Sequence, residues 1–397
     1  MFIIYLKDIC RWMAERVYTM FSTEMIKKYV EEHLDELILL HKELCLIPAP
    51  SHKEELRAAY CKEWFDKNCG EGAYIDEAKN VIFPYGCIGN SLSVICAHTD
   101  TVFPDLEPMP YSDDGEIIRC PGVGDDTASL AVLMMSAKFF VENKVEAKRG
   151  ILFIANACEE GLGNLKGTRQ LFKDYDGRIR DFISYDSKFP GVATTCVGSH
   201  RYLVEVLTAG GHSWGAFGNK NAIAELAGIA KAIYEIELPK KDGKRVTYNV
   251  GTISGGTSVN TIAQRAEMLC EYRSDDLDLL RFMETRFSEI FEAARIDGVT
   301  VNVTLVGDRP CMGDVDPREQ ERVTKIHADA LREFTGLEIK EHSSSTDCNI
   351  PLSLGIPAVA VGVYKGGGTH TREEWIEKSS LKPGFAIGIK TALNLVW

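Results

Sequence analysis

Ile151-Leu-Phe-Ile-Ala-Asn-Ala-Cys-Glu159-Glu160-Gly161 is the stretch from which the fold can be predicted. Its apolar run has the length and composition of a strand that is buried on both faces of a sheet. The run ends in two adjacent carboxylates, and open α/β sheets place ligand-binding groups at this carboxyl edge. Two neighbouring like charges are unfavourable unless a cation or a proton shares their space. The stretch therefore predicts a metal site or a carboxyl group of raised pKa; the alternative is a strand that runs into a solvated acidic turn.

A second predicted strand, residues 92–97, runs directly into His98-Thr99-Asp100. A histidine and an acid two residues apart lie on the same side of a pleated strand. Asp100 can therefore hold the imidazole of His98 in one tautomer while the other ring nitrogen binds a metal. The alternative is a histidine and an aspartate in an ordinary polar loop.

Three further places along the chain put polar groups beside predicted strands or helices. A strand ends at Asp186, and the strand predicted at residues 358–363 is followed by a glycine-rich turn and His370. Gly124-Asp125-Asp126 precedes a long predicted helix, where either aspartate can be a helix N-cap or a ligand. A histidine in a glycine-rich loop has an ordinary structural explanation as well.

The order of the predicted elements indicates two kinds of sheet. Strands alternate with helices over residues 25–198 and again over residues 309–397, which favours a mostly parallel sheet. Residues 199–308 instead follow the order β-α-β-β-α-β, typical of a ferredoxin-like α+β unit. The sequence therefore predicts an α/β protein with a ferredoxin-like insertion. Residues 1–24 are expected to be an amphipathic helical N-terminal extension.

Local signals place the first two helices of this α/β part. Apolar residues recur every three or four positions over residues 25–46, as in an amphipathic helix with one buried stripe. Ser51 and Glu54 have the spacing of a capping box for a second helix that extends to about residue 68.

Composition limits the class of protein. The chain has 397 residues, of which 45% are hydrophobic and 26% charged, and a formal net charge of −13. This charge argues against a nucleic-acid-binding or anionic-membrane-binding surface. The twelve cysteines have no framework spacing, which favours reduced thiols in a cytosolic compartment. The N-terminus carries Lys7, Asp8 and Arg11 and makes a poor signal peptide. We therefore expect a cytoplasmic protein.

Five motifs, in this order and at these spacings, resemble the M20 family of di-zinc metallopeptidases and amidohydrolases. Peptidase T and related aminopeptidases are the members it is most similar to, and the resemblance spans the chain after residue 25. It implies a catalytic domain (residues 25–198 and 309–397) with an inserted lid and dimerisation domain (199–308). The motifs are His98-Thr-Asp100, Gly124-Asp125-Asp126, Glu159-Glu160-Gly161, Asp186 and Gly368-Thr-His370.

The resemblance implies roles for these residues. His98 and Asp186 would bind one metal ion, Glu160 and His370 would bind the other, and Asp125 would bridge the two. Asp100 would orient His98, and Glu159 would be the general base. Two zinc ions are expected, although nitrogen and oxygen ligands also accept cobalt or manganese.

The predicted lid contains two more segments that match the family. Gly210-Gly211-His212-Ser213 resembles the segment that reaches a neighbouring active site, where His212 would stabilise an oxyanion. Asn260 and Arg273 are similar to residues that hold a substrate carboxylate, for which the forked donors of arginine are suited. Both residues can also be ordinary polar residues at a strand edge. The family pattern further implies a homodimer formed through the lid.

These observations lead to three hypotheses for function. The first is a zinc aminopeptidase that acts on short peptides, since Asp rather than Glu at position 186 resembles the aminopeptidase and dipeptidase members. The second keeps the metal centre but makes the protein a deacylase or carboxypeptidase of amino-acid derivatives, because Asn260 and Arg273 would serve any substrate with a free carboxylate. The third is an inactive member that binds peptides.

Overall fold

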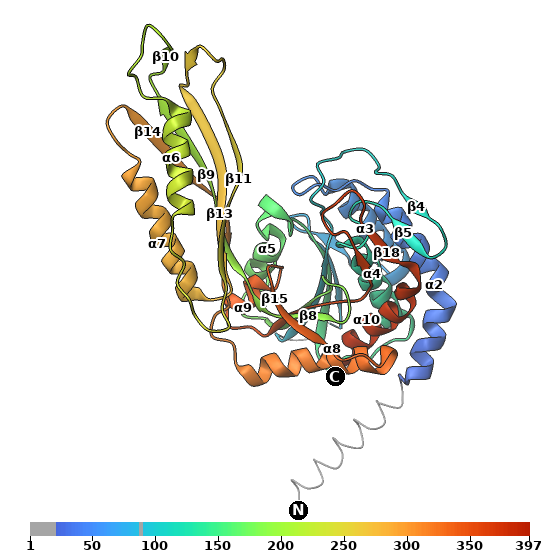
Figure 1. The fold of residues 1–397 in the computed structure, drawn as a ribbon. Helices are drawn as coiled ribbons and strands as arrows, with labels where there is room; N and C mark the ends of the chain where they lie inside the picture. Colours follow the sequence, from blue (N-terminus) through green and yellow to red (C-terminus); the bar gives the residue numbers. More distant parts are fainter. Residues whose placement is uncertain (1–20, 87–89) are drawn as a thin grey trace, which may run out of the picture.

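The computed structural model describes residues 21–86 and 90–397 (Figure 1). Most of the predicted N-terminal extension lies outside these ranges. The division of the chain at residues 25, 199 and 309 remains a prediction. Among the helices of the described ranges, none combines the length and the hydropathy that are needed to cross a lipid bilayer.

The main sheet has eight strands in the order β1-β2-β6-β3-β7-β16-β8-β15. Its centre, β6-β3-β7-β16, is parallel, whereas β2 pairs with β6 and β8 pairs with β16 in the antiparallel sense. The strands are β1 (Tyr74–Ile75), β2 (Val81–Tyr85), β3 (Leu92–His98), β6 (Gly150–Asn156), β7 (Ile179–Ser184), β8 (Gly191–Cys196), β15 (Lys340–Ser344) and β16 (Ala358–Val361).

Strand β6 is apolar without alternation because helices cover both faces of the sheet. Ile151 and Phe153 belong to one hydrophobic cluster, and Leu152 and Ile154 belong to another. The first cluster joins the sheet to five helices, and the second joins it to two short helices. The five are α2 (Thr23–Cys45), α3 (Glu55–Cys69), α4 (Thr127–Glu142), α8 (Pro317–Thr335) and α10 (Leu381–Val396), and the two are α5 (Lys166–Asp174) and α9 (Asn349–Ser353).

A second, four-stranded antiparallel sheet extends away from the main sheet (Figure 1). Its strands have the order β11-β13-β9-β14, and α6 (Ala222–Tyr234) and α7 (Leu277–Ala293) pack on it around a separate core. This is the predicted ferredoxin-like unit, and with the mostly parallel main sheet it confirms the predicted fold class. The strands are β9 (Gly198–Thr208), β11 (Val246–Gly255), β13 (Arg265–Ser274) and β14 (Val299–Arg309). We call this unit the lid.

Two small sheets complete the fold. At the far tip of the lid, β10 (Gly211–His212) pairs with β12 (Thr261–Ile262) (Figure 1). Beside the main sheet, β5 (Ile117–Arg119) pairs with β4 (Ser112–Asp113) and with β18 (Trp375–Glu377), which also pairs with β17 (Gly366–Gly367).

The predicted capping box is wrong. The second helix begins at Glu55, and Glu54 occupies the N-cap position without a side-chain cap. The Ser51 hydroxyl instead donates to Asp100 Oδ2 at 2.6 Å. The hydroxyl of Ser51 thus bonds to a carboxylate near the end of β3. A hydrogen bond to a charged acceptor is stronger than the local helix cap that the sequence predicted.

Candidate metal centre

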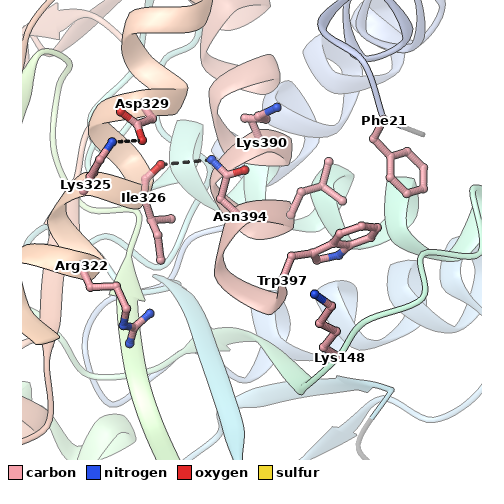
Figure 2. A pocket seen from close by; sticks show the side chains of 10 residues that line it. Phe21, Lys148, Arg322, Lys325, Ile326, Asp329, Lys390, Asn394 and Trp397 are labelled. Atoms are coloured by element: carbon pink, nitrogen blue, oxygen red, sulfur yellow. Dashed lines mark hydrogen bonds and ion pairs between the residues drawn. The ribbon is translucent and has the colours of Figure 1, made fainter. Parts of the chain in front are cut away.

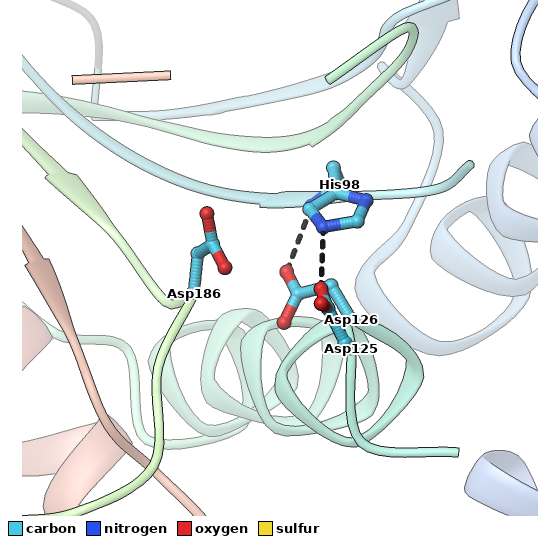
Figure 3. Close-up of side chains that lie close together, drawn as sticks. All are labelled: His98, Asp125, Asp126 and Asp186. Carbon is cyan, nitrogen blue, oxygen red and sulfur yellow. Dashed lines mark hydrogen bonds and ion pairs between the residues drawn. The ribbon is translucent and has the colours of Figure 1, made fainter. Parts of the chain in front are cut away.

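His98, the last residue of β3, is buried and points its ring toward a group of carboxylates (Figure 3). Its Nε2 lies 3.0 Å from Asp125 Oδ1, and its Nδ1 lies 2.9 Å from the carbonyl oxygen of Asp100. Although burial opposes the charged ring, hydrogen bonds to Asp100 and Asp125 raise the pKa of His98 well above its ordinary value. One ring nitrogen therefore contacts the backbone carbonyl of Asp100, and the other faces the carboxylates. The orienting role of the Asp100 carboxylate stays a prediction.

The Asp100 carboxylate also accepts hydrogen bonds that the sequence did not predict. It accepts the backbone N–H groups of Glu159 and Glu160, each at 2.9 Å, and the hydroxyl of Ser51 at 2.6 Å. Its contact with the His98 ring is longer, at 3.5 Å. Asp100 thus joins the carboxyl ends of β3 and β6, and it fixes the two glutamates relative to His98.

The first cluster consists of His98, Asp125, Asp126 and Asp186, which come from β3, from the loop before α4 and from the residues after β7 (Figure 3). Each offers one ligand atom, and these atoms lie within 4.8 Å of one another. Burial raises the pKa of Asp126 and of Asp186 well above the ordinary range. Crowding of several buried carboxylates around one imidazole requires a cation or bound protons.

The family resemblance assigned Asp125 rather than Asp126 as a ligand, and the contacts of Asp126 explain its place in the cluster. It occupies the N-cap position of α4 but makes no side-chain cap, and its Oδ2 accepts the backbone N–H of His98 at 2.9 Å. Within the described ranges, its other oxygen has no hydrogen-bond partner. Asp126 therefore fixes the backbone at His98, while Asp125 faces the ring nitrogen.

The second cluster consists of Asp125, Glu160 and His370, again with ligand atoms within 4.8 Å of one another. His370 Nε2 lies 3.0 Å from Glu160 Oε1 and 3.2 Å from Asp125 Oδ2. Burial raises the pKa of Glu160 to about 7, and hydrogen bonds to Asp125 and Glu160 raise the pKa of His370 to about 10. The two oxygens of Asp125 thus face different imidazoles, which is the disposition expected of a ligand shared by two ions.

Glu159 lies beside both clusters and has a partner that sequence reasoning missed. Its Oε1 accepts Nη1 of Arg309 at 2.9 Å, and Arg309 Nη2 donates to the Glu159 carbonyl oxygen. Both side chains are almost fully buried. Among the described residues, no hydrogen bond reaches Glu159 Oε2. Arg309 ends the last lid strand, in the segment Gly-Asp-Arg-Pro, and no motif of the sequence marks it.

A cavity of about 470 Å³ opens beside the two clusters, between the main sheet and the base of the lid. Asp125, Glu159, Glu160, Asp186 and His370 border it. The cationic side chains of Arg201, Arg273 and Arg309 and the segment of residues 344–346 also line it.

Two of these arginines share one carboxylate. Glu271 accepts Nε of Arg273 at 2.7 Å and Nε of Arg201 at 3.2 Å. Glu271 and Arg201 are directly opposite on β13 and β9, so the three side chains lie on one face of the lid sheet. Two cations held by one anion leave a net positive charge at the base of the lid.

The remaining predicted residues, His212 and Asn260, are far from this cavity. They are exposed and lie close to each other at the lid tip, where Ser213 N–H donates to the Asn260 carbonyl oxygen at 3.0 Å. Arg273, by contrast, is eight residues along β13 from the tip end of that strand, a distance of roughly 26 Å. Within one chain, Asn260 and Arg273 therefore do not meet. The roles of His212 and Asn260 stay predictions.

The donor set of the two clusters fits a pair of divalent ions. It offers imidazole nitrogen and carboxylate oxygen, which zinc, cobalt and manganese all accept. The ring nitrogens already face the carboxylate oxygens that would share an ion with them. The residue groups thus match the chemistry of a dinuclear centre without rearrangement of the strands that carry them.

A second cavity, of about 400 Å³, lies between α8 and α10 and is more apolar (Figure 2). Phe21, Ile326 and Trp397 line it. Lys325 pairs with Asp329, and Arg322 pairs with acids outside the cavity, so these cations are already neutralised. None of the candidate metal clusters found in the described ranges borders this cavity.

Comparisons with known proteins agree with this picture. The family model described as Peptidase family M20/M25/M40 matches residues 94–394. A probable carboxypeptidase from Trichophyton verrucosum is 22% identical over 280 residues, which cover 62% of this chain and 60% of that protein. A putative succinyl-diaminopimelate desuccinylase DapE from Mycobacterium tuberculosis is 24% identical over 342 residues, covering 83% of this chain and 90% of that protein. The match thus spans about 60% of the length of the carboxypeptidase relative.

Solved structures share the fold. The aminopeptidase PepT of Bacillus cereus superposes with a TM-score of 0.70 at 20% identity and covers 91% of this chain and 99% of that one. A Bacillus subtilis protein described as a dinuclear metal binding peptidase superposes with a TM-score of 0.62 at 14% identity and covers 92% and 99%. At these identities the likeness shows a common architecture.

Proposed function

Because this chain belongs to peptidase family M20/M25/M40, we propose that it is a metal-dependent hydrolase of amide bonds in short peptides or amino-acid derivatives. The observation that carries the proposal is the convergence of His98 and His370 on the two oxygens of Asp125, with Glu159 beside them. Asp125, Glu159, Glu160, Asp186 and His370, from four separate segments of the chain, border one cavity, and a purely structural role does not require this arrangement.

We propose that His98 and Asp186 hold one ion, that Glu160 and His370 hold the other, and that Asp125 is shared. Two zinc ions in these positions would polarise the amide carbonyl and lower the pKa of a nearby water molecule. The residues of the chain supply the remaining steps. Asp100 fixes His98 and the backbone of both glutamates, so the ligands are in place before substrate binds.

Glu159 is our candidate for the general base. Its Oε1 is held by Arg309, and it borders the cavity, so its Oε2 is available to take a proton from the attacking water. The same carboxyl group can then pass this proton to the nitrogen of the leaving amine. Arg309 holds Glu159 in one orientation through its side-chain and backbone oxygens.

The charges of the cavity favour substrates with a free carboxylate close to the scissile amide. Every acidic residue that borders the cavity belongs to the metal clusters or is Glu159, whereas Arg201 and Arg273 add cationic side chains to its lining. A free carboxylate matches the donors of these arginines, and a free ammonium group does not. This observation supports a carboxypeptidase or an amino-acid deacylase.

Aminopeptidase activity is the second candidate, and the presence of Asp186 in the first cluster supports it. For a dipeptide the two activities cleave the same bond, because the free amine and the free carboxylate flank it. They differ for longer peptides, for N-acyl amino acids and for peptides amidated at the carboxyl end.

A substrate panel on zinc-loaded protein tests the proposal. We expect hydrolysis of dipeptides and N-acetyl amino acids, and a loss of at least about tenfold in kcat/KM when the carboxyl end is amidated, because a charge-assisted hydrogen bond contributes about 1.5–3 kcal/mol. Amidated peptides cleaved as fast as free ones, with N-acetyl amino acids untouched, would instead establish an aminopeptidase. Absence of zinc-dependent hydrolysis across the panel would leave a peptide-binding protein.

Replacement of Arg273 by Met is expected to raise KM for free-carboxyl substrates by about 10- to 150-fold, because one charge-assisted hydrogen bond is lost. kcat should change little, and amidated substrates should be unaffected. Arg265→Met is the matched control, since Arg265 lies on the same strand, is exposed and pairs with Glu205 and Glu267. Equal KM values for wild type and Arg273→Met would exclude a role of Arg273 in carboxylate binding.

In this proposal, His212 and Asn260 act only in the active site of a second copy of the chain. Their place at the lid tip keeps them away from their own cavity. We propose that a homodimer formed through the lid brings them to the cavity of the partner, where His212 would stabilise the developing oxyanion.

A further inference from the structure

We propose that Glu374 is a positioning residue, which sets the loop of Asp125 and the hairpin of His370 relative to each other so that metal can bind. This inference rests on the metal centre proposed above. Glu374 was not among the residues predicted from the sequence. It does not touch the cavity but lies behind Asp125, almost completely buried.

The carboxylate of Glu374 accepts three backbone N–H groups from the loop that carries Asp125. Oε2 accepts Gly122 N–H at 2.8 Å, and Oε1 accepts the N–H groups of Gly124 at 3.1 Å and Asp125 at 2.9 Å. Cys120 N–H donates to the carbonyl oxygen of Glu374 at 3.3 Å. Three donors from one turn thus meet a single side chain, which holds the whole turn in place.

The loop is held from its other side as well. A Cβ atom on Gly124 would lie 2.6 Å from the ring of Tyr364, so only glycine lets this ring pack against the turn. Gly122 has a φ of 75°, in the region that glycine adopts without strain. The turn therefore lies between the Tyr364 ring and the Glu374 carboxylate, and Asp125 leaves it in a defined direction.

The same hairpin carries the second histidine. His370 lies in the connection between β17 and β18, and Glu374 is the last residue before β18. The pairing of β18 with β5 and the three N–H bonds of Glu374 fasten this hairpin beside the Asp125 loop. His370 Nε2 then meets Asp125 Oδ2 at 3.2 Å. One carboxylate thus fixes the relative position of two ligands that are 245 residues apart in the chain.

Glu374→Gln is the decisive variant. A glutamine amide keeps one acceptor oxygen but turns an N–H group toward at least one of the three backbone donors. We expect zinc affinity, measured by competition with a chromophoric chelator, to fall about 10- to 100-fold, as is typical when a group behind a metal ligand is removed. Metal content after dialysis, measured by mass spectrometry, should fall below two ions per chain.

Two further variants make the test specific. Asp276→Asn is the matched control, because the Asp276 carboxylate also accepts two backbone N–H groups, at 3.1 Å each, but lies in the lid. It should leave zinc affinity unchanged. Glu374→Asp keeps the charge on a shorter side chain and should weaken zinc binding less than Glu374→Gln. If circular dichroism shows that Glu374→Gln does not fold, the zinc affinity of Glu374→Asp tests the inference instead.

The failure of this inference can be separated from the failure of the metal centre. If the wild type binds two ions and the folded Glu374 variants bind them equally tightly, Glu374 has no positioning role and the centre stands. If the wild type binds no divalent ion, the proposed function fails and the role of Glu374 fails with it.

Discussion

Replacement of Glu159 by Gln is expected to lower kcat by about 100- to 10,000-fold while the zinc content stays at that of the wild type, because general acid–base catalysis contributes an effect of this size. The amide oxygen of glutamine can still accept the hydrogen bond from Arg309, but the side chain cannot take up a proton. The measurement is steady-state hydrolysis of a dipeptide, together with metal analysis of the same sample. Glu77→Gln, at an exposed position, is the control.

Variants of the Glu159–Arg309 ion pair should also change the free energy of unfolding, which provides a second test of this pair. Removal of one partner of a buried ion pair leaves the other charge uncompensated, which costs up to about 3–5 kcal/mol of unfolding free energy. A double variant, Glu159→Gln with Arg309→Met, should recover part of this stability but none of the activity. Full turnover in either variant would show that Glu159 is not the base.

Replacement of Asp125 by Ala is expected to have the second large effect. The two oxygens of Asp125 contact His98 at 3.0 Å and His370 at 3.2 Å, so loss of this side chain should remove at least one ion per chain. Metal ions contribute several kcal/mol of transition-state stabilisation, which corresponds to a loss of roughly 1,000-fold or more in turnover. Metal analysis and hydrolysis assays on the folded variant provide the measurement.

The control for this variant is Asp297→Ala, at an exposed position in the lid. It should retain both ions and full activity. Two ions per chain in folded Asp125→Ala would contradict a shared ligand, whatever the effect on turnover.

The polar strand ends were predictable from the sequence because they obey a simple rule. Each apolar run becomes a buried parallel strand, and the carboxyl ends of such strands meet at one edge of the sheet. His98, Glu160 and Asp186 therefore lie together although 62 and 26 residues separate them along the chain. The β-α-β-β-α-β order likewise predicted the sheet of the lid, since each element has a clear hydrophobic period.

Other parts of the site were not predictable, for reasons of distance and of chemistry. Arg309 and Glu374 act on residues that lie 150 and about 250 positions away, and neither belongs to a local pattern. Ser51 was assigned to a helix cap because sequence spacing reveals local partners only, whereas its partner is Asp100. Asn260 and Arg273 are only thirteen residues apart in the sequence, but the strand β13 extends between them and separates them in space. The spacing in the sequence did not reveal this separation.

Anomalous diffraction from crystals of zinc-loaded protein tests the central claim most directly. We predict two strong peaks per chain, one between His98 and Asp186 and one between Glu160 and His370, with the Asp125 carboxylate in contact with both. Absence of peaks at these residues at full zinc loading, or peaks bound elsewhere on the chain, would contradict the dinuclear centre and the function built on it.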